Sequence, residues 1–198
     1  MDKTKEQAKQ PAKGKKSRKS RPMRDFSWHY MQKQVDTQTP MVFVTRDGEI
    51  RATVLEHGMF EHLLSVDGEP TPVEKLTLQY HYKQMDADTV AEKTGVDEAV
   101  RDKNEPTPLG YKQRHLLPNS ALWKSKRERI ATRFTMRNGA VFRGMIDWFG
   151  PYEVKLSIGP RGEDDTASVI LHRHAALSVE LLEEPDLPSD DPPTDEDA

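Results

Sequence analysis

The chain has 198 residues, of which 34% are hydrophobic and 32% are charged, and its mean hydropathy is -0.84. This composition argues against a single large hydrophobic core and favours small folded units with solvated tails. The absence of cysteine excludes disulfides, cysteine-based zinc sites and thiol nucleophiles. Because the chain also lacks an apolar run of about 18 residues, we expect a soluble, cytoplasmic protein.

Charges of opposite sign gather at the two ends of the chain. Residues 1–24 hold ten Lys or Arg and two acids, a balance of +8, which predicts a disordered basic arm. Such an arm attracts nucleic acid, with a solubilising tail as the alternative. Residues 183–198 hold eight acids, no base and four prolines, which predicts a disordered acidic tail with a balance of -8.

Residues 25–84 predict a short helix followed by strands. Ser27 can cap a helix that runs to Gln34, with Trp28 and Met31 at helical spacing. Strands are predicted at 41–45, 50–54, 60–66 and 74–82, with a hairpin turn at 46–48 and a turn-rich stretch at 67–72. Residues 85–118 form a polar linker, in which 88–101 has helical character interrupted at Gly95.

Residues 119–182 repeat this plan. A helix at 119–128 precedes strands at 130–136, 140–149, 152–158, 168–174 and 176–181, with a polar loop at 159–166. Three pairs of residues at matching places are 91 or 92 residues apart: Gly48 and Gly139 in the first hairpin, Phe60 and Tyr152 at the third strand, Tyr80 and His172 in the fourth. We therefore predict a mainly β chain with two tandem, five-stranded, bent antiparallel barrels, each preceded by a short α-helix. Barrels this small have thin cores, which favours oligomers.

Motifs in the second half lie in an order and spacing known from one family. They are the basic patch KRERI at 126–130, FTMRNG at 134–139, FRGMIDWF at 142–149, Tyr152, and HRHA at 172–175. The glycine in the third motif permits a sharp bend in its strand. Together these motifs resemble the bacterial RNA chaperone Hfq, a member of the Sm-like (LSm) family whose domains are SH3-type barrels.

The resemblance implies a ring of protomers that binds RNA on three surfaces and needs no cofactor. On the pore face, Tyr152, Arg173 and His174 would bind uridine by stacking and charge. On the rim, Lys126, Arg127 and Arg129 would contact phosphates. On the opposite face, Asn138, Gly139 and Arg143 would bind weakly, because Thr135 stands where the family has a stacking aromatic ring. In the first half, Phe60, His81 and Lys83 form a further candidate RNA site, although packing of these aromatics in the core or at a protomer interface is slightly favoured.

The expected function is that of an Hfq-like RNA chaperone that binds U-rich single-stranded RNA, with small regulatory RNA and mRNA as partners. A homo-oligomer is expected, either a trimer of tandem domains or a hexamer. An Sm-like scaffold with little RNA affinity is the alternative. No acid–base pair or phosphate-binding loop indicates an enzyme. His172 and His174 could hold a metal from one side of a strand, but the sequence offers no third ligand.

Overall fold

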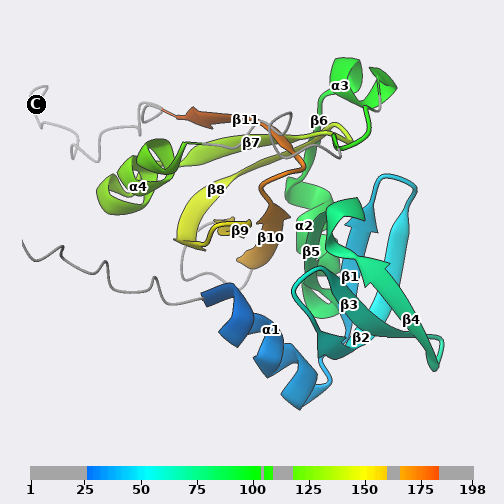
Figure 1. Ribbon diagram of the computed structural model, residues 1–198. Coiled ribbons are helices and arrows are strands. Elements are labelled where there is room, and N and C mark those ends of the chain that lie inside the picture. Colours follow the sequence, from blue (N-terminus) through cyan, green and yellow to red (C-terminus); the bar gives the residue numbers. More distant parts are fainter. Residues whose placement is uncertain (1–25, 104, 109–117, 160–165, 183–198) are drawn as a thin grey trace, which may run out of the picture.

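The computed structural model describes residues 26–103, 105–108, 118–159 and 166–182 (Figure 1). The predicted basic arm at 1–24, the acidic tail at 183–198 and most of the loop at 159–166 lie outside the described residues. No helix in the described ranges is long and apolar enough to cross a membrane.

The first half consists of one helix and five strands. These are α1 (Phe26–Thr37), β1 (Met41–Thr45), β2 (Glu49–His57), β3 (Glu61–Val66), β4 (Glu69–Glu74) and β5 (Leu78–Lys83), with a 3-10 turn, η1 (Lys75–Thr77), before β5. The sequence predicted one strand over 74–82. Residues 78–82 do lie in β5, but residue 74 ends β4 and residues 75–77 form η1, so the predicted strand begins too early. Pro70 and Pro72 suggested a loop, but β4 is the edge strand of the sheet, where a missing N–H is tolerated.

The linker carries η2 (Gln84–Asp86), α2 (Ala87–Lys93), a two-residue strand, β6 (Gly95–Val96), and α3 (Glu98–Lys103). The second half consists of α4 (Asn119–Glu128), β7 (Thr132–Met136), β8 (Ala140–Phe149), β9 (Glu153–Ile158), β10 (Ala167–His172) and β11 (Ala176–Leu181). The predicted hairpin glycine is confirmed, because Gly139 has a φ of 83° between β7 and β8.

The eleven strands in the described part of the chain belong to one open antiparallel sheet, in the order β11-β7-β8-β9-β10-β5-β1-β2-β3-β4 with β6 paired to β8. The mainly β composition is thus confirmed, but the prediction of two separate Sm-like barrels is wrong. The physical reason is the pairing of β5 with β10, in which Tyr82 lies opposite Val169 and Tyr80 opposite Leu171. An edge strand of each five-stranded set pairs with the other set, so neither set closes on itself.

Each half nevertheless keeps the same internal order, with its fifth strand beside its first and its fourth strand at the other edge. The equivalences Gly48 with Gly139 and Phe60 with Tyr152 agree with this order. The equivalence of Tyr80 with His172 is wrong, because Tyr80 lies in the fifth strand of its half and His172 in the fourth.

The core lies on both sides of the strands at the centre of the sheet. Met41 and Phe43 of β1 face a cluster formed by the first half, with Met31, Val54 and Leu64. Alternate residues of the same strand, Val42 and Val44, face a second cluster, together with Tyr80, Tyr82 and the apolar residues of the second half. Because β1 is buried on both faces, its sequence MVFV is a continuous apolar run rather than an alternating one.

Gly144 lies where β8 crosses closely over β9. A Cβ atom at this position would lie 2.1 Å from the carbonyl oxygen of Ser157. We expect Gly144→Ala to lower the free energy of unfolding by about 3 kcal/mol, because the two strands must move apart. The matched control is Gly150→Ala, since an added Cβ there meets nothing within 4 Å. Urea denaturation of both variants measures the effect, and equal stability would contradict a close strand approach at Gly144.

Candidate nucleic-acid interface

Two exposed aromatic side chains lie on the first turn of α1, and two more lie at turns whose neighbouring residues contact that turn. We call them the aromatic surface: Phe26, Trp28, Phe60 and Tyr152, whose exposed fractions are 45%, 47%, 79% and 73%. Phe60 precedes β3 and Tyr152 precedes β9, so they occupy the same place in the two halves.

Helix α1 links the two turns that carry Phe60 and Tyr152. The Ser27 hydroxyl donates a hydrogen bond to the carboxylate of Glu153, the residue next to Tyr152. The centre of the Trp28 ring lies 3.9 Å from that of His57, which ends β2 just before the turn to Phe60. The predicted capping role of Ser27 is wrong, because α1 already begins at Phe26 and the hydroxyl bonds to the other half of the chain.

The other two pore-face residues lie beneath Tyr152 rather than beside it. Arg173 is buried, and its guanidinium Nη1 donates to the carbonyl of Gly150 over 2.8 Å. Its backbone N–H donates to the carbonyl of Tyr152, also over 2.8 Å. His174 is half-buried, with Nε2 3.0 Å from the carbonyl oxygen of Leu78 in the first half. Arg173 therefore holds the turn that presents Tyr152.

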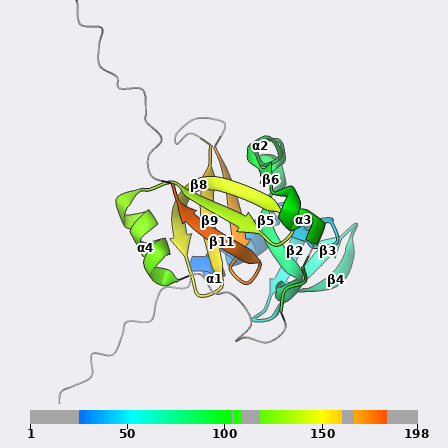
Figure 2. The ribbon, with the colours of Figure 1, turned by 90° about the horizontal axis from the view of Figure 1, so that it is seen from above.

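The three predicted rim cations are at the end of α4, on the side of the molecule away from β4 (Figure 2). Lys126 donates to the carbonyl of Asp147 over 2.6 Å and is half-buried. Arg127 is exposed and forms an ion pair with Glu128. Arg129 is exposed and closes the helix with a left-handed φ of 54°. Arg127 and Arg129 thus face solvent, whereas Lys126 is engaged with the backbone.

The predicted opposite-face residues lie at the β7–β8 hairpin, which the linker covers. A Cβ added at Gly139 would lie 2.6 Å from Cβ of Arg101 in α3, and the Asp97 N–H donates to the Gly139 carbonyl. Asn138 is half-buried, with its side-chain oxygen accepting from the Ala140 N–H, and Arg143 is exposed. Of these three residues, Gly139 is closed off by α3.

The three residues of the candidate RNA site in the first half lie apart in the fold. Phe60 is exposed, whereas His81 is fully buried between Phe43 and His172. Lys83 ends β5 and lines a cavity beside Tyr30 and Lys155. The three predicted residues therefore share no surface.

Buried histidines lie on both sides of the β5–β10 junction. Nδ1 of His81 lies 3.2 Å from Nε2 of His172, and Nδ1 of His172 lies 3.8 Å from a carboxylate oxygen of buried Glu153. His62 lies on the other side of Phe43, and neither of its ring nitrogens has a hydrogen-bond partner in the described part of the chain. Burial lowers the pKa of His62 to about 2 and that of His81 to about 3, and it also lowers the pKa of His172.

Sequence reasoning did not identify Phe26 and Trp28 as candidate RNA contacts, and it did not predict the buried contact between His81 and His172. Trp28 shares helical spacing with the buried Met31, so the spacing alone gave no signal that the Trp28 ring is exposed. For the metal alternative at His172 and His174, the described residues offer no group of three or more His, Asp or Glu side chains placed to hold a metal ion. Comparison with protein-family models and with curated proteins finds no match for this chain.

The buried histidines should make the fold sensitive to acid. Their folded-state pKa values lie below the unfolded value of about 6.5, so the unfolded chain binds protons first as the pH falls. The free energy of unfolding should be highest above pH 6.5 and fall below it by about 1.4 kcal/mol per pH unit for each histidine. Urea denaturation at neutral and mildly acidic pH measures this slope.

Two variants test the assignment of that slope. His62→Leu should reduce the pH dependence of the free energy of unfolding by about 1.4 kcal/mol per pH unit, the contribution of one histidine. It should not weaken the fold, because it removes a buried ring whose nitrogens have no described partner. Met85→Leu, an exposed substitution that removes no titratable group, should leave the slope unchanged. An unchanged slope in His62→Leu would contradict the role of burial.

Proposed function

We propose that this chain is an RNA-binding protein related to Hfq, which binds U-rich single-stranded RNA and acts as an RNA chaperone in post-transcriptional regulation. Its partners would be small regulatory RNA and mRNA, and the absence of cysteine fits a cytoplasmic location. The observation that carries the proposal is the aromatic surface, above all Tyr152 and Phe60 at matching turns of the two halves.

Exposed rings at turns need an explanation other than packing, because more than 70% of the Tyr152 and Phe60 side chains faces solvent. A flat aromatic ring is the platform on which unpaired bases stack, at about 1–3 kcal/mol per base. Four such rings on or near the first turn of α1 offer stacking positions for more than one base.

Phosphate binding requires cations within reach of the same strand. Arg127 and Arg129 supply exposed guanidinium groups on α4. Arg173 acts in this proposal as a positioning residue, because its side chain holds the Gly150 carbonyl beneath the turn that presents Tyr152.

We also infer a homo-oligomer from the two unpaired edges of the sheet. Within the chain, the fifth strand of the first half (β5) pairs with the fourth strand of the second half (β10). The strands left at the two edges of the sheet are β11, the fifth strand of the second half, and β4, the fourth strand of the first half. The same kind of pairing between chains would join β11 of one chain to β4 of the next. Both halves would then enter one ring, which favours a trimer over a hexamer.

A scaffold with little RNA affinity is the second candidate. It is favoured by the engagement of Lys126 and Arg173 with backbone carbonyls, which leaves fewer cations for phosphates. Measurement of RNA affinity separates the two candidates.

Tyr152→Ala should weaken binding of U-rich RNA by about tenfold, because it removes a stacking platform. Tyr152→Phe is the matched control, since it keeps the ring.

Arg127→Ala with Arg129→Ala should reduce the slope of log affinity against log salt by about 0.7 for each phosphate that is no longer neutralised. Fluorescence anisotropy at two salt concentrations measures both effects, and no RNA binding at low salt would refute the proposed function.

Native mass spectrometry of the full chain should give the mass of a trimer. Leu177→Lys with Ser178→Lys in β11 should shift the population to monomers, because the lysines charge an edge strand that must pair with β4. Val179 stays in place because it packs against the core. Met59→Lys with Met85→Lys, at exposed positions outside both edge strands, is the matched control and should leave the mass unchanged. A hexamer, or an unchanged mass in the β11 variant, would contradict the inferred assembly.

A further inference from the structure

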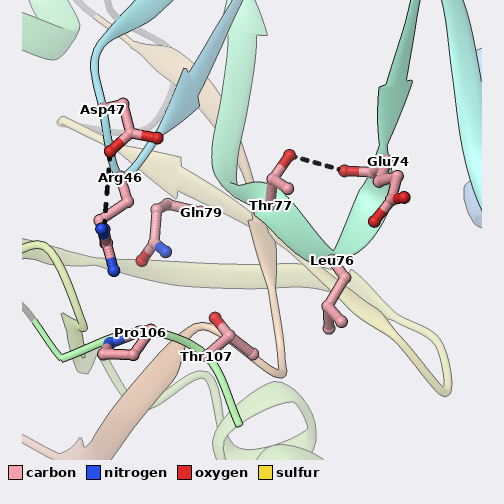
Figure 3. A pocket seen from close by; sticks show the side chains of 8 residues that line it. All are labelled: Arg46, Asp47, Glu74, Leu76, Thr77, Gln79, Pro106 and Thr107. Carbon is pink, nitrogen blue, oxygen red and sulfur yellow. Dashed lines mark hydrogen bonds and ion pairs between the residues drawn. The ribbon is translucent and has the colours of Figure 1, made fainter. Parts of the chain in front are cut away.

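A cavity of about 200 Å³ lies at the end of the β1–β2 hairpin that is away from the aromatic surface (Figure 3). The cavity and the aromatic surface lie toward opposite ends of strand β2, which runs from Glu49 beside the hairpin to His57 beside Trp28. The lining comes from three parts of the chain: Arg46 and Asp47 of the hairpin, Glu74, Thr77 and Gln79 around η1, and Thr107 of the linker.

Gln79 is the unusual member of this lining. The residue is only 2% exposed, and its side-chain oxygen has no hydrogen-bond partner among the described residues. Figure 3 shows the amide pointing into the space between Arg46 and the segment Pro106–Thr107. A buried amide oxygen without a partner costs free energy, and native proteins leave few of them. This oxygen is therefore a candidate contact for a ligand.

The rest of the lining shows which ligand chemistry would fit. Asp47 and Glu74 bring carboxylates, and the Thr77 hydroxyl already donates its hydrogen to the Glu74 carbonyl over 2.8 Å. The Arg46 guanidinium lies 3.6 Å from the Asp47 carboxylate. The Gln79 oxygen is the acceptor left without a described partner, so the ligand should present an N–H donor to it. The Gln79 amide also supplies a donor, its NH₂ group, beside the unpaired oxygen.

We propose that this cavity binds an RNA base that carries an exocyclic amino group. The amino group would donate to the Gln79 oxygen, and the neighbouring ring nitrogen would accept from the Gln79 NH₂ group. Adenine, cytosine and guanine have this pair of groups. Uracil can also pair with a side-chain amide, through its N3–H and the adjacent carbonyl, but that group has a single hydrogen, whereas an amino group has a second one for a lining carboxylate. The proposal rests on the proposed RNA-binding function and adds to it a second recognition site with the opposite base preference.

The size of the cavity agrees with a single base. A cavity of about 150 Å³ holds a benzene molecule, so this one has room for a heteroaromatic ring with its amino group. It is smaller than the roughly 300–1,000 Å³ of pockets for larger ligands, such as a dinucleotide cofactor.

Saturation-transfer NMR on the full chain, with AMP, CMP, GMP and UMP as separate probes, tests the proposal. We expect transfer to at least one amino-bearing nucleotide and weaker binding of UMP. Gln79→Leu should reduce the affinity for that nucleotide by about tenfold, because a paired amide contact of this kind is worth a factor of that order. Gln84→Leu, the same substitution at an exposed position outside the cavity and the aromatic surface, is the matched control and should leave this binding unchanged.

The variant should fold, because leucine removes a buried amide oxygen without a described partner, and urea denaturation checks this. If Gln79→Leu does not fold, Gln79→Met replaces it with an unbranched apolar chain. The proposal is overturned if no amino-bearing nucleotide binds, if UMP binds as tightly, or if the folded variant binds like the wild type.

Anisotropy with U-rich RNA on the same preparations keeps the two proposals apart. If U-rich RNA binds but no amino-bearing nucleotide does, the cavity proposal fails and the proposed function stands. If an amino-bearing nucleotide binds through Gln79 but no RNA binds, the proposed function fails and the cavity remains a nucleotide site.

Discussion

The pairing of β5 with β10 is the contact on which the rest of the structure depends. It joins two five-stranded sets into one sheet, and it buries both faces of the strands at the centre. Without this pairing, both strands would be edges with unsatisfied backbone groups. The same pairing sets His81 beside His172, so polar side chains that would be solvated in separate halves are enclosed in the fold.

The aromatic surface also follows from this junction. Helix α1 belongs to the first half, but Ser27 reaches Glu153 at the start of β9 in the second half. That contact is available only because the junction fixes one half against the other. The turns before β3 and β9 consequently both lie near the first turn of α1, through the contacts of His57 with Trp28 and of Glu153 with Ser27.

The linker is part of the fold rather than a spacer between two units. Strand β6 pairs with β8, and α3 closes over Gly139 at the β7–β8 hairpin. Farther along, Thr107 completes the cavity that Gln79 faces. The linker therefore covers Gly139, one of the three residues where the family resemblance implied weak RNA binding, and it helps to form a different cavity at the other hairpin.

The sequence by itself determined the local structure. Asn-Gly and Asp-Gly turns, apolar alternation and the duplicated order of motifs predicted most strands and the two hairpins, because these depend on neighbouring residues. It also singled out Tyr152. Only the tertiary structure decided that the sets join through β5 and β10, that Arg173 and His81 are buried, and that Trp28 and Gln79 border candidate binding surfaces. These outcomes depend on contacts between residues some 90 positions apart, such as His81 with His172 and Leu78 with His174, which no local pattern records.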